Sequence, residues 1–134
     1  MLMLTVLLLL AGCGSRPPMA KVSSGDTEIP AELGTYSWKT FNRHIVADAE
    51  GPNDMMADKE AVTLEPGGEV KVSFSNKPKR LVLTRWVGNE AAEETELESN
   101  RFAVPAEAGE YVYGIRAEWS KHKSGTFAIK IKVE

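Results

Sequence analysis

The cysteine and histidine content limits the chemistry that this sequence can perform. The chain has one cysteine, Cys13, and two histidines, His44 and His122. A serine hydrolase needs a histidine that a carboxylate orients. His122 lies in a polar segment that predicts a solvated hairpin tip, and His44 lies in a strand-like run with Asp48 and Glu50 nearby. Neither histidine has the spacing of a zinc-hydrolase motif, so we expect no catalytic residue, and a small hydrolase stays a remote alternative.

Two segments contain side chains that certain metals prefer. Residues 48–54 include two aspartates, a glutamate and Asn53, which are the hard oxygen donors that calcium favours. The spacing lacks the EF-hand pattern, so we favour a solvated turn and a helix capped by Asn53 or Asp54.

Met55 and Met56 offer thioethers, which are soft ligands for copper(I). Adjacent methionines on a short helix point to different faces, which favours packing. We expect neither a metal nor another cofactor.

Cys13 ends a short apolar segment. Residues 2–11 are apolar except for Thr5. Ten residues of helix rise about 15 Å, roughly half the hydrocarbon thickness of a bilayer, which is too short for a stable span. The length matches the apolar region of a secretory signal, although a buried apolar strand is an alternative. The segment closes with the sequence Leu10-Ala11-Gly12-Cys13.

This ending resembles the lipobox of bacterial lipoproteins. In that family the cysteine sulfur takes a diacylglycerol with fatty acids such as palmitate, and cleavage falls just before the cysteine. The resemblance implies a signal peptide over residues 1–12 and a chain that Cys13 anchors to the extracytoplasmic face of the cell membrane. Two or three acyl chains hold firmly, because each buried methylene contributes about 0.8 kcal/mol. An ordinary signal peptide with an incidental cysteine is the alternative.

The rest of the chain divides into a tether and a folded domain. Residues 14–27 contain Pro17-Pro18 and Ser23-Ser24-Gly25 and no aromatic residue. This composition predicts that residues 13–27 form a lipidated, flexible tether. Residues 28–134 are expected to fold as one domain, since 43% of the whole chain is hydrophobic.

Apolar residues in the domain recur at every second position, which is the strand period. The clearest rows are Val70, Val72, Phe74 and, near the C-terminus, Phe127, Ile129, Ile131, Val133. Further strands are predicted over residues 35–40, 42–47, 61–64, 80–87, 95–98, 101–104 and 110–119. One short helix is predicted over residues 53–60. Many short strands between turn residues predict an all-β sandwich or barrel with an N-terminal hairpin.

The segment Glu107-Ala108-Gly109-Glu110-Tyr111-Val112-Tyr113 resembles the Asp-x-Gly-x-Tyr-x-Cys segment of immunoglobulin-like domains. There the tyrosine, here Tyr111, forms the tyrosine corner. Tyr113 stands at the cysteine position, so the resemblance implies an antiparallel immunoglobulin-like β-sandwich without the disulfide, over about residues 61–134. It assigns strand B to 69–74, strand C with an inward Trp86 to 80–86, strand E to 102–104 and strand G to 126–133. With the segment Gly34–Trp38, the chain also resembles small surface lipoproteins of Bacillus-type bacteria, a family that implies no activity.

The tyrosine corner also predicts which residues face outward. With Tyr111 inside, Val112 and Arg116 face out, and an inward Trp86 sends alternate residues of its strand out. The predicted binding face comprises Trp38, Leu81, Leu83, Arg85, Val112 and Arg116, with Val87 at its margin. An exposed apolar patch needs a cover or a partner. The N-terminal hairpin, with Tyr36, Trp38 and Phe41, is one such cover, and a protein or cell-wall partner is the other.

Composition narrows the remaining function classes. A formal charge of -3 argues against nucleic acid as the main partner. We therefore expect a lipid-anchored extracytoplasmic binding or accessory module without catalytic activity, which meets the membrane through its lipid. An inhibitor or modulator of an envelope or secreted enzyme is the alternative, with residues 50–54 and 88–94 as its inserted loops.

Overall fold

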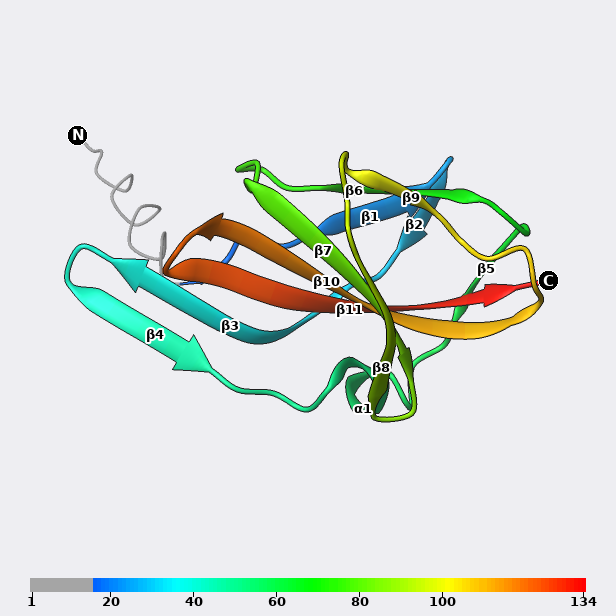
Figure 1. The fold of residues 1–134 in the computed structure, drawn as a ribbon, viewed down its shortest axis with the longest axis horizontal. Helices are drawn as coiled ribbons and strands as arrows, with labels where there is room; N and C mark the ends of the chain where they lie inside the picture. Colours follow the sequence, from blue (N-terminus) through cyan, green and yellow to red (C-terminus); the bar gives the residue numbers. More distant parts are fainter. Residues whose placement is uncertain (1–15) are drawn as a thin grey trace, which may run out of the picture.

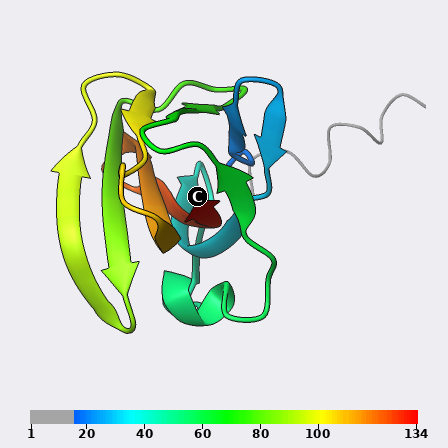
Figure 2. The ribbon, with the colours of Figure 1, turned by 90° about the vertical axis from the view of Figure 1, so that its right-hand side faces the viewer.

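The structure, a computed structural model, describes residues 16–134, which form eleven strands and one short helix. Two sheets pack face to face, and the helix α1 (Pro52–Met55) lies on the outer side of the larger sheet (Figure 1). Seen from the C-terminal end, the layers follow one another as small sheet, large sheet and helix (Figure 2). The predicted all-β sandwich is confirmed.

The small sheet has four strands, and the large sheet has seven. The order in the small sheet is β2 (Thr27–Ile29), β1 (Lys21–Ser24), β6 (Glu69–Ser73) and β9 (Arg101–Ala103). The path through the large sheet is β4 (Arg43–Ala47), β3 (Glu32–Thr40), β11 (Lys123–Val133), β10 (Gly109–Ser120), β7 (Arg80–Val87) and β8 (Glu90–Glu96). The short strand β5 (Val62–Leu64) runs parallel to the end of β11.

The pairing of the C-terminal strands agrees with the neighbours that the immunoglobulin-like resemblance implies. Strand β6 pairs with β9, and β7 pairs with β10, which pairs with β11. These are the B–E and C–F–G neighbours of an immunoglobulin-like sandwich. The Tyr111 hydroxyl donates a hydrogen bond of 2.7 Å to the backbone carbonyl of Glu107, so the tyrosine corner is present. The β3–β4 hairpin extends this sheet beyond β11.

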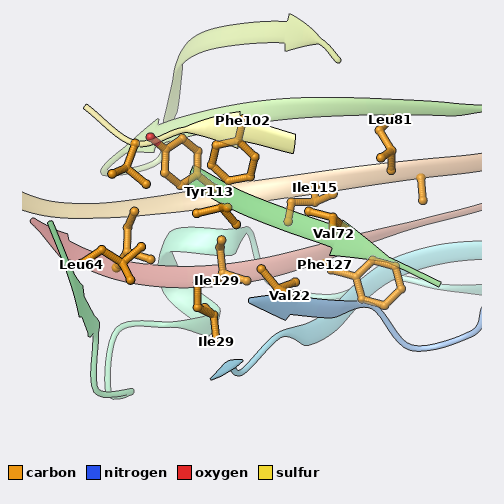
Figure 3. Close-up of a cluster of buried hydrophobic side chains, with 14 of the residues drawn as sticks. Val22, Ile29, Leu64, Val72, Leu81, Phe102, Tyr113, Ile115, Phe127 and Ile129 are labelled. Carbon is orange, nitrogen blue, oxygen red and sulfur yellow. The ribbon is translucent and has the colours of Figure 1, made fainter. Parts of the chain in front are cut away.

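Apolar side chains from the inner faces of both sheets form the main core (Figure 3). Phe127, Ile129 and Ile115 of the large sheet are fully buried and belong to the same cluster as Val22 and Val72 of the small sheet. The alternation in β11 explains this placement, because every second side chain of a strand reaches the same face. Burial of these side chains is the main force that holds the sheets together.

One end of this core is aromatic. The rings of Trp38 and Trp119 meet edge to face at 5.2 Å between centroids, and Phe74 lies 5.2 Å from Trp119 and 5.5 Å from Phe127. Such pairs add to the stabilisation that burial gives. The turns between β3 and β4 and between β10 and β11 lie beyond this cluster.

The predicted tether over residues 13–27 is wrong at Pro17, which is buried, and from Lys21 onward. Residues 21–24 form β1, which pairs with β6, and the Val22 side chain is only 2% exposed. A short edge strand needs only one or two inward apolar side chains, so its polar composition concealed it. Gly25, with φ of 58°, makes the tight turn to β2. The sandwich therefore begins before residue 28. Cys13 and residues 1–12 lie outside the described residues.

Two further segments differ from their prediction. The helix predicted over residues 53–60 ends at Met55, and its N-cap is Gly51 with no side-chain cap, so neither Asn53 nor Asp54 has the predicted capping role. Most of the predicted loop over residues 88–94 belongs to β8, a fully exposed edge strand that pairs with β7. Its charged side chains protect this edge from pairing with another chain, and their polarity hid the strand pattern.

The tyrosine corner leads to a prediction about stability. Tyr111→Phe removes one hydrogen bond and leaves the ring in place, so we expect the free energy of unfolding to fall by about 1 kcal/mol. Tyr113→Phe is the matched control on the same strand, since no hydrogen bond of its hydroxyl is found among the described residues. Chemical denaturation measures both. Equal losses in the two variants would contradict a specific role for the corner.

Candidate functional site

The structure divides the predicted binding face between the two sides of the large sheet. Leu81 (8% exposed) and Trp38 (5% exposed) belong to the inner core, and Leu83 packs against it. Val112 and Arg116 face outward, as predicted. The six residues therefore do not form one surface, and the predicted face is wrong as a unit.

The error comes from the orientation of Trp86. Residues that pair directly across antiparallel strands share a face, and Val112 pairs with Trp86. Trp86 therefore points outward, whereas Leu81 and Leu83 point into the core. Arg85 is the register partner of Tyr113 and therefore lies on the inner side of the sheet. Its Nε atom is 3.8 Å from Glu93 Oε1. Apolar residues occupy both faces of this strand, so alternation alone did not reveal which side is buried.

The predicted cover is wrong as well. The β3–β4 hairpin lies beside β11 and not across the β7–β10 face. Trp38 points into the core, and Phe41 is fully exposed at the hairpin turn. The outer face is instead covered by the α1 segment. Met56, Val112 and Ala128 form a second buried cluster there, with Met55 and Trp86 packed against it.

Beside this cluster, the outer face of the large sheet contains a pocket of about 240 Å³. Apolar and small side chains form most of it, and ionisable side chains stand at its margin. The lining includes Gly34, Pro52, Met55, Thr84, Trp86, Gly114, Thr126 and Ala128, with Glu50, Glu94 and Arg116 as the ionisable members. We call this the outer-face pocket.

Two glycines allow the walls of the outer-face pocket to approach the sheet. A Cβ atom on Gly114 would lie 3.2 Å from both Pro52 Cγ and Trp86 Nε1. A Cβ atom on Gly34 would lie 2.9 Å from Met55 Sδ. Both glycines are inside strands, where glycine often marks the close approach of another group. This is the sequence signal that would have pointed to the pocket.

Lys130 fixes the α1 segment over the sheet. Its ammonium group donates hydrogen bonds to the backbone carbonyls of Met56 (3.2 Å), Lys59 (3.0 Å) and Ala57 (3.5 Å). The side chain of Lys130 is only 14% exposed. A cation bound to several carbonyls holds an irregular segment well, because charge-assisted hydrogen bonds are stronger than neutral ones. The wall of the pocket is therefore attached to β11.

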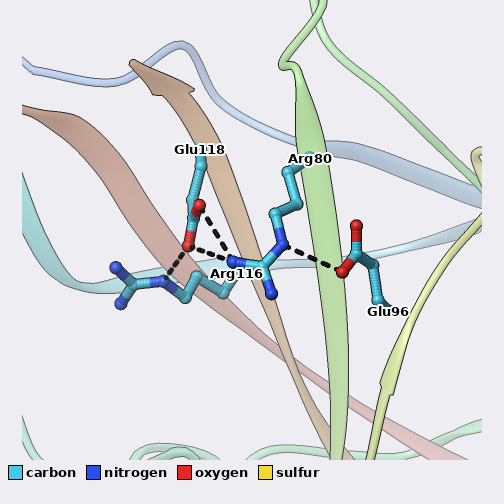
Figure 4. A network of polar contacts seen from close by, with 4 residues as sticks. All are labelled: Arg80, Glu96, Arg116 and Glu118. Carbon is cyan, nitrogen blue, oxygen red and sulfur yellow. Dashed lines mark hydrogen bonds and ion pairs between the residues drawn. The ribbon is translucent and has the colours of Figure 1, made fainter. Parts of the chain in front are cut away.

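A chain of ion pairs lies beside the pocket margin (Figure 4). The Arg116 guanidinium donates to Glu118 at 2.8 Å, and Arg80 bridges Glu118 (3.2 Å) and Glu96 (3.1 Å). The hydrogen bond from Arg116 is the largest cause of a lowered pKa at Glu118, burial opposes it, and Arg80 adds to it. The network orients Arg116, whose side chain is about half exposed next to the pocket.

The histidines lie away from this pocket, near two hairpin turns. His44 Nε2 is 2.8 Å from Ser37 Oγ, and the rings of His44 and His122 are 6.2 Å apart. His122 occupies the β10–β11 turn, as predicted.

Within residues 16–134, no three histidine, cysteine, aspartate or glutamate side chains come together in a way that could hold a metal ion. Met56 is buried in the second cluster, which agrees with packing.

Comparisons with known proteins give no family. A scan of the chain against protein-family models found no match, and a search among curated proteins found none either. Among the described residues, no helix combines the length and the apolar character needed to cross a bilayer.

The attachment of the α1 segment can be tested at Lys130. Lys130→Met keeps much of the aliphatic stem and removes the ammonium, so we expect a loss of about 1.5–3 kcal/mol in unfolding free energy. Amide hydrogen exchange in residues 52–59 should rise more than exchange in β10 and β11. Lys132→Met, on the same strand, is the control, because the one ion pair of Lys132 within residues 16–134 is with the exposed Glu134 at 3.4 Å. Equal effects of the two substitutions would contradict the role of Lys130.

Proposed function

We propose that this chain is a lipid-anchored, extracytoplasmic binding module that Cys13 attaches to the membrane and that acts by binding without catalysis. The observation that supports the binding role is the outer-face pocket, which Trp86 and the α1 segment form on the outside of the sandwich. The partner is a protein or cell-wall component that offers an apolar group to this pocket and polar groups to its margin.

The anchor rests on the sequence before the domain. The apolar segment over residues 2–11 is followed by Leu10-Ala11-Gly12-Cys13 with no gap. Strand β1 begins at Lys21, so only seven residues separate Cys13 from the sandwich. A short connection of this kind would hold the domain close to the lipid surface.

The pocket has properties suited to binding. Glycine, proline and β-branched residues line it, and they lose little side-chain entropy when a ligand binds. Aromatic and methionine side chains, here Trp86 and Met55, are common at contact surfaces. The ionisable members Glu50, Glu94 and Arg116 are exposed. A catalytic acid or base usually depends on burial or a close charge to shift its pKa, which favours binding over catalysis here.

The anchor predicts the chemical state of residue 13. Intact-mass measurement of protein extracted from membranes should show a chain that begins at Cys13 and carries a diacylglycerol. The Cys13→Ser variant should lack the lipid and keep residues 1–12, because the cysteine sulfur is the acceptor. A wild-type chain with an unmodified Cys13 would contradict the anchor.

The pocket predicts that substitutions of the neighbouring residues Trp86 and Val87 have different effects on partner binding. In capture experiments from detergent-solubilised membranes, wild-type protein should retain a saturable partner, and Trp86→Ala should lose at least ten-fold in affinity, equivalent to about 1.4 kcal/mol. Val87→Ala is the matched control, since Val87 is exposed and lies outside the pocket. Melting temperatures verify that both variants are folded. Equal capture by all three proteins would contradict binding through the pocket.

A further inference from the structure

One end of the sandwich exposes a large apolar side chain. At this end, the β3–β4 turn carries Phe41, which is fully exposed. Met19, which precedes β1, is 48% exposed, and Val46 of β4 is 60% exposed. Among residues 16–134, Val87 is the other large apolar side chain with such exposure, and it lies at the far end of β7. Phe41 is the most exposed of these four side chains, and it lies at the tip of its hairpin.

Positive charge gathers at the same end. Lys39 and Arg43 flank Phe41, and Lys121 and Lys123 flank His122 in the neighbouring turn. The backbone N–H of Lys39 donates to the carbonyl of His122 at 3.1 Å, which joins the two hairpins. Residues 37–47 and 119–126 contain no aspartate or glutamate. We call the turns over residues 40–43 and 120–123, with these four cations, the basic end.

The opposite end has the opposite charge. Its loops over residues 65–68 and 104–108 contain Glu65 and Glu107 but no lysine or arginine, and the chain finishes there at Glu134. Figure 1 shows the C-terminus at one end of the long axis and the β3–β4 turn at the other. A protein with a net charge of -3 thus carries a local cluster of cations at the basic end.

The N-terminal connection approaches the basic end. Pro17 is buried, and its ring packs on β11 so closely that a Cβ atom on Gly125 would lie 3.0 Å from Pro17 Cγ. Gly125 is two residues from Lys123 of the basic end. Cys13 precedes Arg16 by three residues, which span at most about 11 Å when extended. A lipid on Cys13 would therefore enter the bilayer near the basic end.

The basic end is also rigidly supported. Trp38 of β3 and Trp119 of β10 lie in edge-to-face contact beneath the two turns. The Lys123 ammonium lies 5.3 Å from the centre of the Trp38 ring. The strands that carry the two turns are therefore joined to the aromatic end of the core.

From these observations we propose that the basic end is a membrane-docking surface that recognises anionic lipid headgroups. Phe41 enters the headgroup region, and Lys39, Arg43, Lys121 and Lys123 meet lipid phosphates. Basic groups beside a lipid anchor strengthen attachment to anionic membranes. The docking deepens the proposed function and rests on lipidation of Cys13. It orients the long axis away from the bilayer, so that the outer-face pocket stays open along the side of the sandwich.

A fluorescence experiment on the full lipidated chain tests this docking. In that chain the Cys13 sulfur is in a thioether, so a cysteine placed elsewhere is the single thiol that can be labelled. Asn42→Cys, beside Phe41, and Asn89→Cys, in the β7–β8 turn, form a matched pair, because that turn lies away from the basic end (Figure 1). Each labelled protein is reconstituted into vesicles of phosphatidylglycerol and phosphatidylcholine. We expect an environment-sensitive dye at residue 42 to shift to the blue and to be quenched several-fold less by acrylamide than the dye at residue 89.

Two further samples separate the contribution of lipid charge from that of the Phe41 side chain. In vesicles of phosphatidylcholine alone the difference between the labels should shrink, and Phe41→Ser in the Asn42→Cys chain should remove most of the blue shift. Equal quenching of both labels in anionic vesicles, with the protein still lipidated by mass, would overturn the docking alone. An unmodified Cys13 would overturn the anchor and the docking together, so the two failures are distinguishable.

Discussion

The pairing of β10 with its two neighbours governs the rest of the structure. Strand β10 lies between β7 and β11, and its register decides which side chains of all three strands face the small sheet. Because Tyr111 is fixed inward by its hydrogen bond to Glu107, Tyr113, Ile115 and Ala117 follow it into the core. A shift of one residue would exchange the two faces, exposing the core and burying Arg116.

The outer face of the large sheet is only partly covered. A four-residue helix cannot shield a seven-stranded sheet, so α1 protects Val112 and Ala128 and leaves a pocket beside them. Gly34 and Gly114 bring the helix segment close, and Lys130 holds it there. The two glycines and the Lys130 hydrogen bonds that complete the packing thus also shape the surface that we propose as the binding site.

The two proposed contacts lie on different parts of the molecule. The basic end holds Phe41 and its flanking cations, whereas the outer-face pocket lies along the middle of the large sheet near Gly114. An anchored domain needs this separation, because a surface that meets the bilayer is not available to another partner. Aromatic packing between Trp38 and Trp119 connects the basic end to the core and gives it a stable base.

Sequence alone determined the strand-rich class, most strand positions and the tyrosine corner, and it predicts the lipid site at Cys13. These features are local, since a period of two, a turn residue or a lipobox can be recognised within a few positions. Tertiary structure decided that Trp86 faces outward, that residues 21–24 are a strand and that Gly114 lies at a pocket. Each of these depends on a partner far along the chain, because apolar residues on both faces of β7 and a single inward valine in β1 leave the local pattern ambiguous until the strands pair.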